Sequence, residues 1–355
     1  MAVRNKTKEI QEFIIYNVEA HPTDIAKLIT EKFGISRVAA INHLRLLEKG
    51  DLLEAIGLTK ARHYKLKYIA FDRKVLTTAQ LREDEVWSNF VKPLFEGVKD
   101  NILGICAHGF TEMLNNVIDH SESSTVEIVV TRSAAEIRLR VRDYGIGIFN
   151  KIQKALNLSE PQHAILELTK GKLTTDKTKH TGEGIFFTSR MFDHFAIGSG
   201  TLIFGRTRRA DRPTPDWIWE SDQAPITGTN VDMSILTNST QTTKEVFDKH
   251  SAEFDEFGFS KTFIPLKLMK YEGEQLISRS QAKRLMTHVD QFKEVVLDFE
   301  GIAEIGQAFA DEVFRVYRKE HPSVHVYPLN TTEDVKKMIK RITSVDPNDP
   351  LNNYF

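Results

Sequence analysis

Three polar side chains, Glu112, Asn116 and His120, recur every fourth residue in the stretch FTEMLNNVIDH, Phe110–His120. On a helix this spacing places them along one face. The apolar residues between them give the helix a second side that can pack on a sheet. A carboxylate, a carboxamide and an imidazole in one row can hold a hydrated Mg²⁺, which prefers oxygen ligands and completes its shell with water and phosphate. Polar residues four apart are also common on exposed helices, so the motifs that follow decide between these interpretations.

Two glycine motifs follow the helix. The first, DYGIGI (143–148), ends a predicted antiparallel pair of strands over 125–131 and 136–142. The second, Gly182-Glu183-Gly184, opens a predicted helix, IFFTSRMFDHF. Strands over 201–206 and 228–236 come next. Since N–H groups at a helix start can hold phosphate, the second motif is a candidate anion site. No GxxxxGK[ST] occurs in the sequence, which excludes a Walker-type nucleotide site.

The sequence resembles GHKL ATP-binding domains in the order of its motifs, which are E-x3-N-x3-H, DxGxG, a variable lid, GxG and a closing strand that begins with Gly-Thr. These are the nucleotide modules of histidine kinases, gyrase-type ATPases, mismatch-repair ATPases and anti-sigma serine kinases. The spacing in the first motif is most similar to the anti-sigma kinase branch. The resemblance covers residues 85–240 and implies an α/β sandwich that binds ATP and Mg²⁺.

The resemblance also implies a role for each matched residue. Glu112 would be the general base, and Asn116 would ligate Mg²⁺ between the phosphates. His120 would close the phosphate side or serve as a structural cap. Asp143 would accept the adenine amino group, and the remaining matched positions would contact the base, the phosphates or the start of the lid: Gly145, Gly147, Gly182, Gly184 and Thr229.

Three lysines lie in the poorly periodic segment 149–181, which corresponds to the lid: Lys172, Lys177 and Lys179. Each is a candidate for reaching the γ-phosphate, Lys179 in particular. A solvated loop is the other interpretation of these charges.

Residues 1–70 read as three helices and a hairpin. The segment FGISRVAAINHLRLLEKGDL resembles the turn and recognition helix of winged helix-turn-helix repressors. From residue 32 to 67 there are eight Lys or Arg (32, 37, 45, 49, 60, 62, 65, 67) against three acids (48, 51, 54). The candidates for contact with double-stranded DNA share long polar or charged side chains on the outer face or the wing: Arg37, Asn42, His43, Arg45, Lys60 and Arg62. Protein docking is the alternative role for such a domain.

The C-terminal part alternates strand and helix over 263–342, which predicts a small parallel or mixed sheet. Its segment EVVLDFEGIAEIGQAFADEVF resembles STAS-like domains, which are found fused behind GHKL modules and imply a possible protein partner. Phosphorylated STAS proteins carry a serine or threonine acceptor where this sequence has Gly306, Gln307 and Ala308. This departure argues against phosphorylation of the tail by its own ATP site.

The chain has 355 residues, with 48 Lys and Arg against 49 Asp and Glu, so no global charge recruits nucleic acid or membrane. A single cysteine, Cys106, excludes an internal disulfide framework and a clustered thiolate metal site. No apolar run reaches membrane-span length, and the basic start leads into an amphipathic helix. We expect a cytoplasmic homodimer that does not enter membranes.

We therefore expect an α/β (α+β) protein with a winged helix at 1–70, a connector at 71–84 and the GHKL domain at 85–240. A second connector at 241–260, a STAS-like domain at 261–345 and a tail at 346–355 complete the chain. The favoured function is a nucleotide-responsive, DNA-binding regulator with slow ATP hydrolysis. A serine/threonine kinase acting on a separate partner and a non-catalytic ATP-binding module remain alternatives. The sequence has no phosphoacceptor hairpin of the histidine kinase kind.

Overall fold

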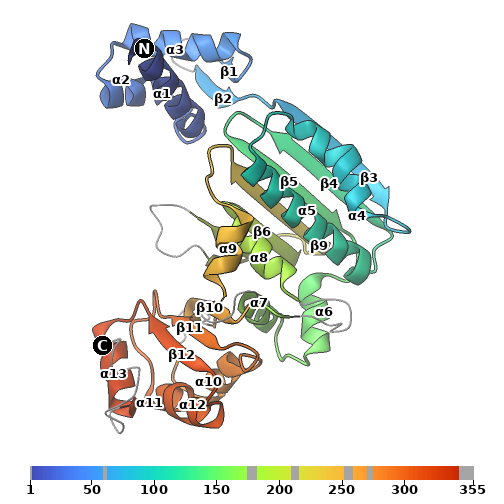
Figure 1. Ribbon diagram of the computed structural model, residues 1–355, viewed down its shortest axis with the longest axis vertical. Helices are drawn as coiled ribbons and strands as arrows, with labels where there is room; N and C mark the ends of the chain where they lie inside the picture. Colours follow the sequence, from blue (N-terminus) through green and yellow to red (C-terminus); the bar gives the residue numbers. More distant parts are fainter. Residues whose placement is uncertain are drawn as a thin grey trace.

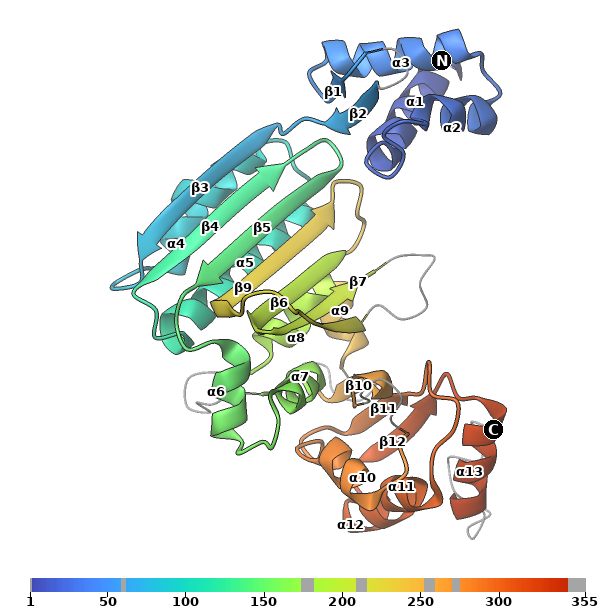
Figure 2. The same ribbon diagram turned by 180° about the vertical axis from the view of Figure 1, so that it is seen from behind.

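The computed structural model describes residues 2–58, 62–173, 182–208, 216–251, 259–269 and 275–343. It is a mixed α/β structure in which three parts follow one another along the long axis of the molecule (Figures 1 and 2). The N-terminal helices lie at one end, a large sheet lies in the middle, and a smaller sheet lies at the other end.

The N-terminal part consists of three helices and a hairpin, as the sequence predicts. Its elements are α1 (Ala2–Asn17), α2 (Ile25–Phe33), α3 (Arg37–Lys49), β1 (Leu53–Ile56) and β2 (His63–Leu66). Gly34 ends α2 with φ of 62°, and the Ser36 hydroxyl accepts the Ala39 N–H at 3.2 Å to begin α3. Apolar residues from all three helices and the hairpin form a separate small core around Ile14 and Leu44.

The middle part is a seven-stranded antiparallel sheet in the order β3-β4-β5-β9-β6-β7-β8. The pairs β4–β5, β6–β7 and β7–β8 join strands that follow one another directly, whereas four helices separate β3 from β4 and β9 inserts between β5 and β6. The strands are β3 (Ala70–Thr77), β4 (Thr125–Arg132), β5 (Glu136–Asp143), β6 (His194–Gly200), β7 (Leu202–Thr207), β8 (Asp216–Glu220) and β9 (Ile226–Leu236).

Helices cover one face of this sheet and leave the other face open (Figures 1 and 2). The long helix α5 (Asp100–His120) buries Ile105, Phe110 and Val117 against the strands, so its apolar stripe sets its orientation. The further helices of this part are α4 (Glu83–Val86), η2 (Trp87–Val91), η3 (Lys92–Phe95), α6 (Ile148–Ala155), α7 (Pro161–Lys170), α8 (Gly184–Met191) and α9 (Thr243–Lys249).

The C-terminal part is a three-stranded parallel sheet in the order β10-β11-β12, as the strand-helix alternation predicts. Its strands are β10 (Lys261–Pro265), β11 (Glu294–Asp298) and β12 (His325–Leu329). Its helices are η4 (Leu266–Met269), α10 (Arg279–Met286), α11 (Gln307–Asp311), η5 (Glu312–Tyr317), α12 (Arg318–Glu320) and α13 (Glu333–Thr343).

The structure differs from the sequence expectations in several places, one of which is the predicted lid 149–181, since it contains most of α6 and all of α7. The first half of the predicted connector 71–84 belongs to β3, the edge strand that pairs with β4. The predicted helix 185–195 ends at Met191, because β6 begins at His194. Part of the second connector forms α9, which Thr242 and Glu245 stabilise as a capping box.

In the part of the chain that the structure describes, no helix combines the length and the apolar character that a membrane crossing requires.

Candidate nucleotide site

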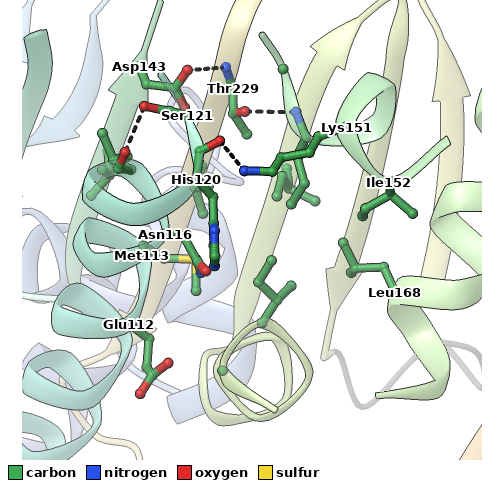
Figure 3. A pocket seen from close by; sticks show the side chains of 18 of the residues that line it. Glu112, Met113, Asn116, His120, Ser121, Asp143, Lys151, Ile152, Leu168 and Thr229 are labelled. Atoms are coloured by element: carbon green, nitrogen blue, oxygen red, sulfur yellow. Dashed lines mark hydrogen bonds between the residues drawn. The ribbon is translucent and has the colours of Figure 1, made fainter. Parts of the chain in front are cut away.

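A cavity of about 320 Å³ opens between α5, the end of β5, α6, α8 and β9. This size is in the range of small-ligand pockets. Figure 3 shows that Glu112, Asn116 and His120 follow one another along α5, while Asp143 and Thr229 lie at one end. Eight of the residues singled out from the sequence line this cavity: Glu112, Asn116, His120, Asp143, Gly147, Gly182, Gly184 and Thr229.

Asp143 is held in a fixed position at one end of the cavity. Its side chain is almost fully buried, and its Oδ1 accepts the Gly145 N–H at 2.9 Å and the Thr229 N–H at 3.2 Å. Burial raises the pKa of this carboxyl, and the hydrogen bonds from Gly145 and Thr229 oppose that effect. Both of these backbone hydrogen bonds fall on Oδ1, and the Asp143 side chain also lines the cavity, so its carboxylate is placed to accept a hydrogen bond from an amino group there.

Strand β9, which carries Thr229, approaches Asp143 at Gly228, a residue to which the sequence motifs assigned no role. Gly228 has φ of 73°, and a Cβ there would come within 2.3 Å of the Asp143 carbonyl oxygen. Any side chain would therefore push β9 away from the carboxylate. The Thr229 hydroxyl accepts the Ile148 N–H at 3.1 Å, so one residue joins Asp143 to the start of α6.

Glu112 lies at the opposite end, against the first residue of α8. A Cβ on Gly184 would come within 2.1 Å of Glu112 Oε2, so only glycine leaves room for this carboxylate beside the helix start. Asn116 and His120 occupy the next two turns of α5 between Glu112 and Asp143. The site thus has a buried acceptor at one end and a carboxylate beside backbone N–H groups at the other.

Lys151 on α6 is a cavity residue that the sequence analysis missed. Its ammonium donates to the His120 carbonyl oxygen at 2.8 Å and lines the same cavity (Figure 3). The available signal was a lysine one turn after Gly147, on the same face as the cavity residues Ile148 and Ile152. A cation there can pair with phosphate oxygens.

The lysines expected in the lid are placed differently. Lys172 donates to the Gln291 carbonyl oxygen at 3.1 Å, and its ammonium lies 4.9 Å from the centre of the Phe292 ring. It therefore contacts the C-terminal part and does not line the cavity. Lys177 and Lys179 lie outside the described residues, and Gly145 adjoins Asp143 without lining the cavity.

The candidate DNA-contacting residues divide into two groups. Arg37, Asn42 and Arg45 are exposed on α3, which faces away from the central sheet (Figures 1 and 2). His43 is half-buried; burial lowers its pKa, and its Nδ1 has no hydrogen-bond partner among the described residues. Lys60 lies outside the described residues.

The hairpin cations are paired within the N-terminal part. Arg62 Nη2 lies 2.9 Å and 3.1 Å from the two carboxylate oxygens of Glu48. Lys65 pairs with Glu54, and Lys67 pairs with Asp51. These partners are the three acids counted in the sequence, so among the described residues of 32–67, Arg37, Arg45 and Lys49 on α3 form the largest group of cations without an acidic partner.

Two family models match the chain. The model of the histidine kinase-like ATPase domain matches residues 78–204, and the model of a STAS-like domain of unknown function matches residues 281–336. No curated protein matches the chain. The first matched range contains Glu112, Asn116 and His120 on α5 and the DxGxG and GxG motifs. The second contains the segment from β11 to α11 of the C-terminal part. The winged-helix resemblance of residues 1–70 stays a prediction. The chain therefore contains a histidine kinase-like (GHKL) ATPase domain, which supports ATP binding, followed by a STAS-like domain.

Proposed function

We propose that this protein is an ATP- and Mg²⁺-binding regulator that passes its nucleotide state to a DNA-binding N-terminal domain and hydrolyses ATP slowly. The observation that carries the proposal is the cavity in which Asp143 and Glu112 lie at opposite ends of one ligand-sized space. Asp143 Oδ2 would accept the adenine amino group, which a guanine, with a carbonyl oxygen at that position, cannot supply.

The phosphates would lie between α5 and the start of α8. The N–H groups at Gly184 and the Lys151 ammonium would contact their oxygens. Among the described residues no group of three His, Cys, Asp or Glu could enclose a metal. A Mg²⁺ here would therefore use the Asn116 carboxamide oxygen together with phosphate and water oxygens. When bound, it would neutralise charge on the phosphates.

Glu112 supports a hydrolytic role because its carboxylate lies beside the helix start that would hold the terminal phosphate. It would orient a water molecule and accept its proton. A kinase acting on a separate protein would use the same carboxylate and is the second candidate. The STAS-like domain is not the favoured acceptor, since Gly306, Gln307 and Ala308 at the start of α11 carry no hydroxyl.

Helix α7 gives the cavity a physical connection to the STAS-like domain. Leu168 lines the cavity, while the Glu167–Lys170 ion pair, with Nζ to Oε1 at 2.6 Å, is buried behind it. The Lys170 ammonium also donates to the Thr287 carbonyl oxygen at 2.8 Å. His288 Nδ1 lies 3.0 Å from Glu167 Oε2. A shift of α7 on nucleotide binding would therefore move α10 with it.

Strand β9 gives the cavity a second connection, toward the N-terminal part. Thr229 near its start lines the cavity, and Thr237 follows its last residue. The Thr237 and Tyr16 hydroxyls lie 2.8 Å apart, which joins the sheet to α1. This contact supports the proposal that nucleotide state biases the position of the winged helix.

The DNA-binding step rests on the exposed face of α3. Arg37, Arg45 and Lys49 are exposed there and have no acidic partner within the described chain. Phosphate contacts by such side chains would make binding fall steeply with salt. Val38 and Leu46 are also exposed on this helix and would suit thymine methyl groups.

Incubation of the full chain with γ-labelled ATP and Mg²⁺ tests the chemistry. We expect slow release of labelled phosphate, lost in Glu112→Ala while ATP binding persists. Label on an added protein would instead establish the kinase function. If ATP binds but the label stays on the nucleotide, the non-catalytic interpretation is correct.

A further inference from the structure

Strand β3 is an edge strand with an unusually apolar exposed side. Phe71 and Val75 of the strand are 59% and 58% exposed, and Tyr68 and Ile69 just before it are 67% and 47% exposed. Its neighbour on one side is β4, and it ends the sheet on the other. A long, exposed edge of this kind is a template for pairing with another strand. Figure 2 shows this edge at the side of the molecule, away from the STAS-like domain.

The free edge has defined hydrogen-bonding groups. The Thr78 N–H donates to the Ser124 carbonyl oxygen at 3.1 Å, which marks the even-numbered residues as those bonded to β4. The odd-numbered residues of β3 itself therefore direct their N–H and C=O groups outward, whereas the N–H of Ile69, just before the strand, also donates to β4, to the Arg132 carbonyl oxygen at 2.7 Å. The Arg73 N–H agrees with this alternation, since it points away from β4 and donates to the Asp72 side chain at 2.8 Å, a bond that pairing with a second strand would replace.

We propose that β3 pairs antiparallel with β3 of a second copy of this chain, about a two-fold axis at Arg73. In this register Asp72 lies opposite Lys74 of the partner subunit twice, and Phe71 lies opposite Val75 of the partner subunit twice. Ala70 likewise meets Leu76 of the partner subunit. Opposite charges and apolar pairs of this kind stabilise neighbouring strands.

Arg73 would face its own symmetry copy, but its charge is already neutralised. Its Nε and Nη2 lie 3.0 Å and 3.1 Å from the two Glu127 carboxylate oxygens. The Tyr144 hydroxyl holds the same carboxylate at 2.9 Å. The ion pair with Glu127 therefore reduces the repulsion between the two Arg73 side chains that face each other at the two-fold axis.

Shifting the axis by one residue destroys the complementarity. Centred on Asp72, the pairing would oppose two aspartates and place Phe71 against Arg73 of the partner subunit. Centred on Lys74, it would oppose two lysines and place Asp72 against Leu76 of the partner subunit. One register therefore satisfies both the charges and the apolar side chains, which identifies a second copy of this chain as the occupant.

The interface has a consequence for the N-terminal domain, which precedes β3 by three residues. Antiparallel pairing places the two N-terminal domains at opposite ends of the joined strands, related by the two-fold axis. Symmetric recognition of a palindromic site requires such a two-fold relation. This consequence rests on the proposed DNA binding, whereas the interface itself does not.

Light scattering of the full chain after size-exclusion chromatography tests the pairing. We expect twice the chain mass of 40.6 kDa for the wild type. Asp72→Lys or Lys74→Asp should raise the dimer dissociation constant about tenfold or more, since each places like charges opposite one another twice. The double variant Asp72→Lys with Lys74→Asp restores opposite charges and should restore the dimer.

Circular dichroism confirms that each variant is folded, and Trp219→Lys on the opposite edge strand β8 is the control that should stay dimeric. A monomeric wild type overturns the proposal. So does a dimer that both single reversals leave intact, or a folded double variant that remains monomeric. ATP-induced stabilisation, measured in the same samples, separates these results from the proposed function, because these side chains lie outside the cavity.

Discussion

Removal of the Lys170 ammonium should separate the STAS-like domain from the ATPase domain. Lys170 and Glu167 expose 1% and 4% of their side chains. Lys170→Met keeps most of the side-chain volume but leaves the buried Glu167 carboxylate with His288 as its remaining partner. It also removes the hydrogen-bond donor to the Thr287 and Arg284 carbonyl oxygens. Loss of one partner of a buried pair costs about 3–5 kcal/mol.

Hydrogen exchange is the direct assay, since it reports local opening of α7 and α10 separately from the rest of the chain. A loss of about 3–5 kcal/mol corresponds to exchange faster by roughly two to three and a half orders of magnitude, at about 1.4 kcal/mol per factor of ten. The double variant Glu167→Gln with Lys170→Met should recover part of the loss, because no charge is then left buried. Burial lowers the pKa of Lys170, and Glu167 opposes that effect.

Lys154→Met on α6 is the matched control, because this lysine is exposed. If Lys170→Met changes exchange at α7 and α10 by less than about 1 kcal/mol, as expected for a surface pair, the account of this junction is wrong. In the wild type, ATP should slow exchange at α10, and Lys170→Met should remove that effect.

Three further predictions concern catalysis, pH and DNA. Glu112→Ala should retain ATP binding, measured by calorimetry, but lower the hydrolysis rate at least about a hundredfold, because a general base acts on the transition state; unchanged turnover would exclude this role. Burial lowers the pKa of His250 to about 2, so the folded state stays neutral while the unfolded state takes up a proton below about 6.5. Stability should therefore fall as the pH drops, by about 2 kcal/mol at pH 5, and His250→Phe should flatten the urea midpoints between pH 5 and 8; an unchanged dependence in His250→Phe would contradict this assignment. Arg37→Ala and Arg45→Ala should each lower the slope of log affinity against log salt by about one for duplex DNA, whereas Arg62→Ala, whose side chain already pairs with Glu48, should change it less; equal effects would argue against α3 as the contact surface.

Most residues of the candidate site could be brought together from the sequence, because their pattern depends on residue types at fixed spacings. Glu112, Asn116 and His120 needed only helical periodicity, and the two glycine motifs mark close backbone approaches that other residues cannot make. Lys151 could not be identified in this way, since a lysine on an amphipathic helix is ordinarily solvated. Its role depends on the packing of α6 against the end of α5.

Three features could not be predicted from the sequence, because each depends on contacts between segments that lie far apart in the chain. The β3 residues contain Asp72, Arg73 and Lys74 in succession, so they lack the alternation that marks a strand, and their pairing with β4 crosses about fifty residues of chain. Arg62 was expected at the wing surface, but its pairing with Glu48 arises only when the hairpin folds back on α3. The Glu167–Lys170 pair is buried by the STAS-like domain, which no local pattern in α7 indicates.

Nucleotide-dependent thermal stabilisation of the wild type and of Asp143→Asn tests the central claim most directly. A ligand that binds the folded state alone, at about 100 times its Kd, stabilises it by roughly 2.7 kcal/mol. We predict that ATP with Mg²⁺ raises the Tm of the wild type, that GTP does so far less, and that Asp143→Asn loses most of the ATP shift while its own Tm shows that it is folded. Equal shifts with ATP and GTP, or a full ATP shift in Asp143→Asn, would contradict the assignment of this cavity as an adenine nucleotide site.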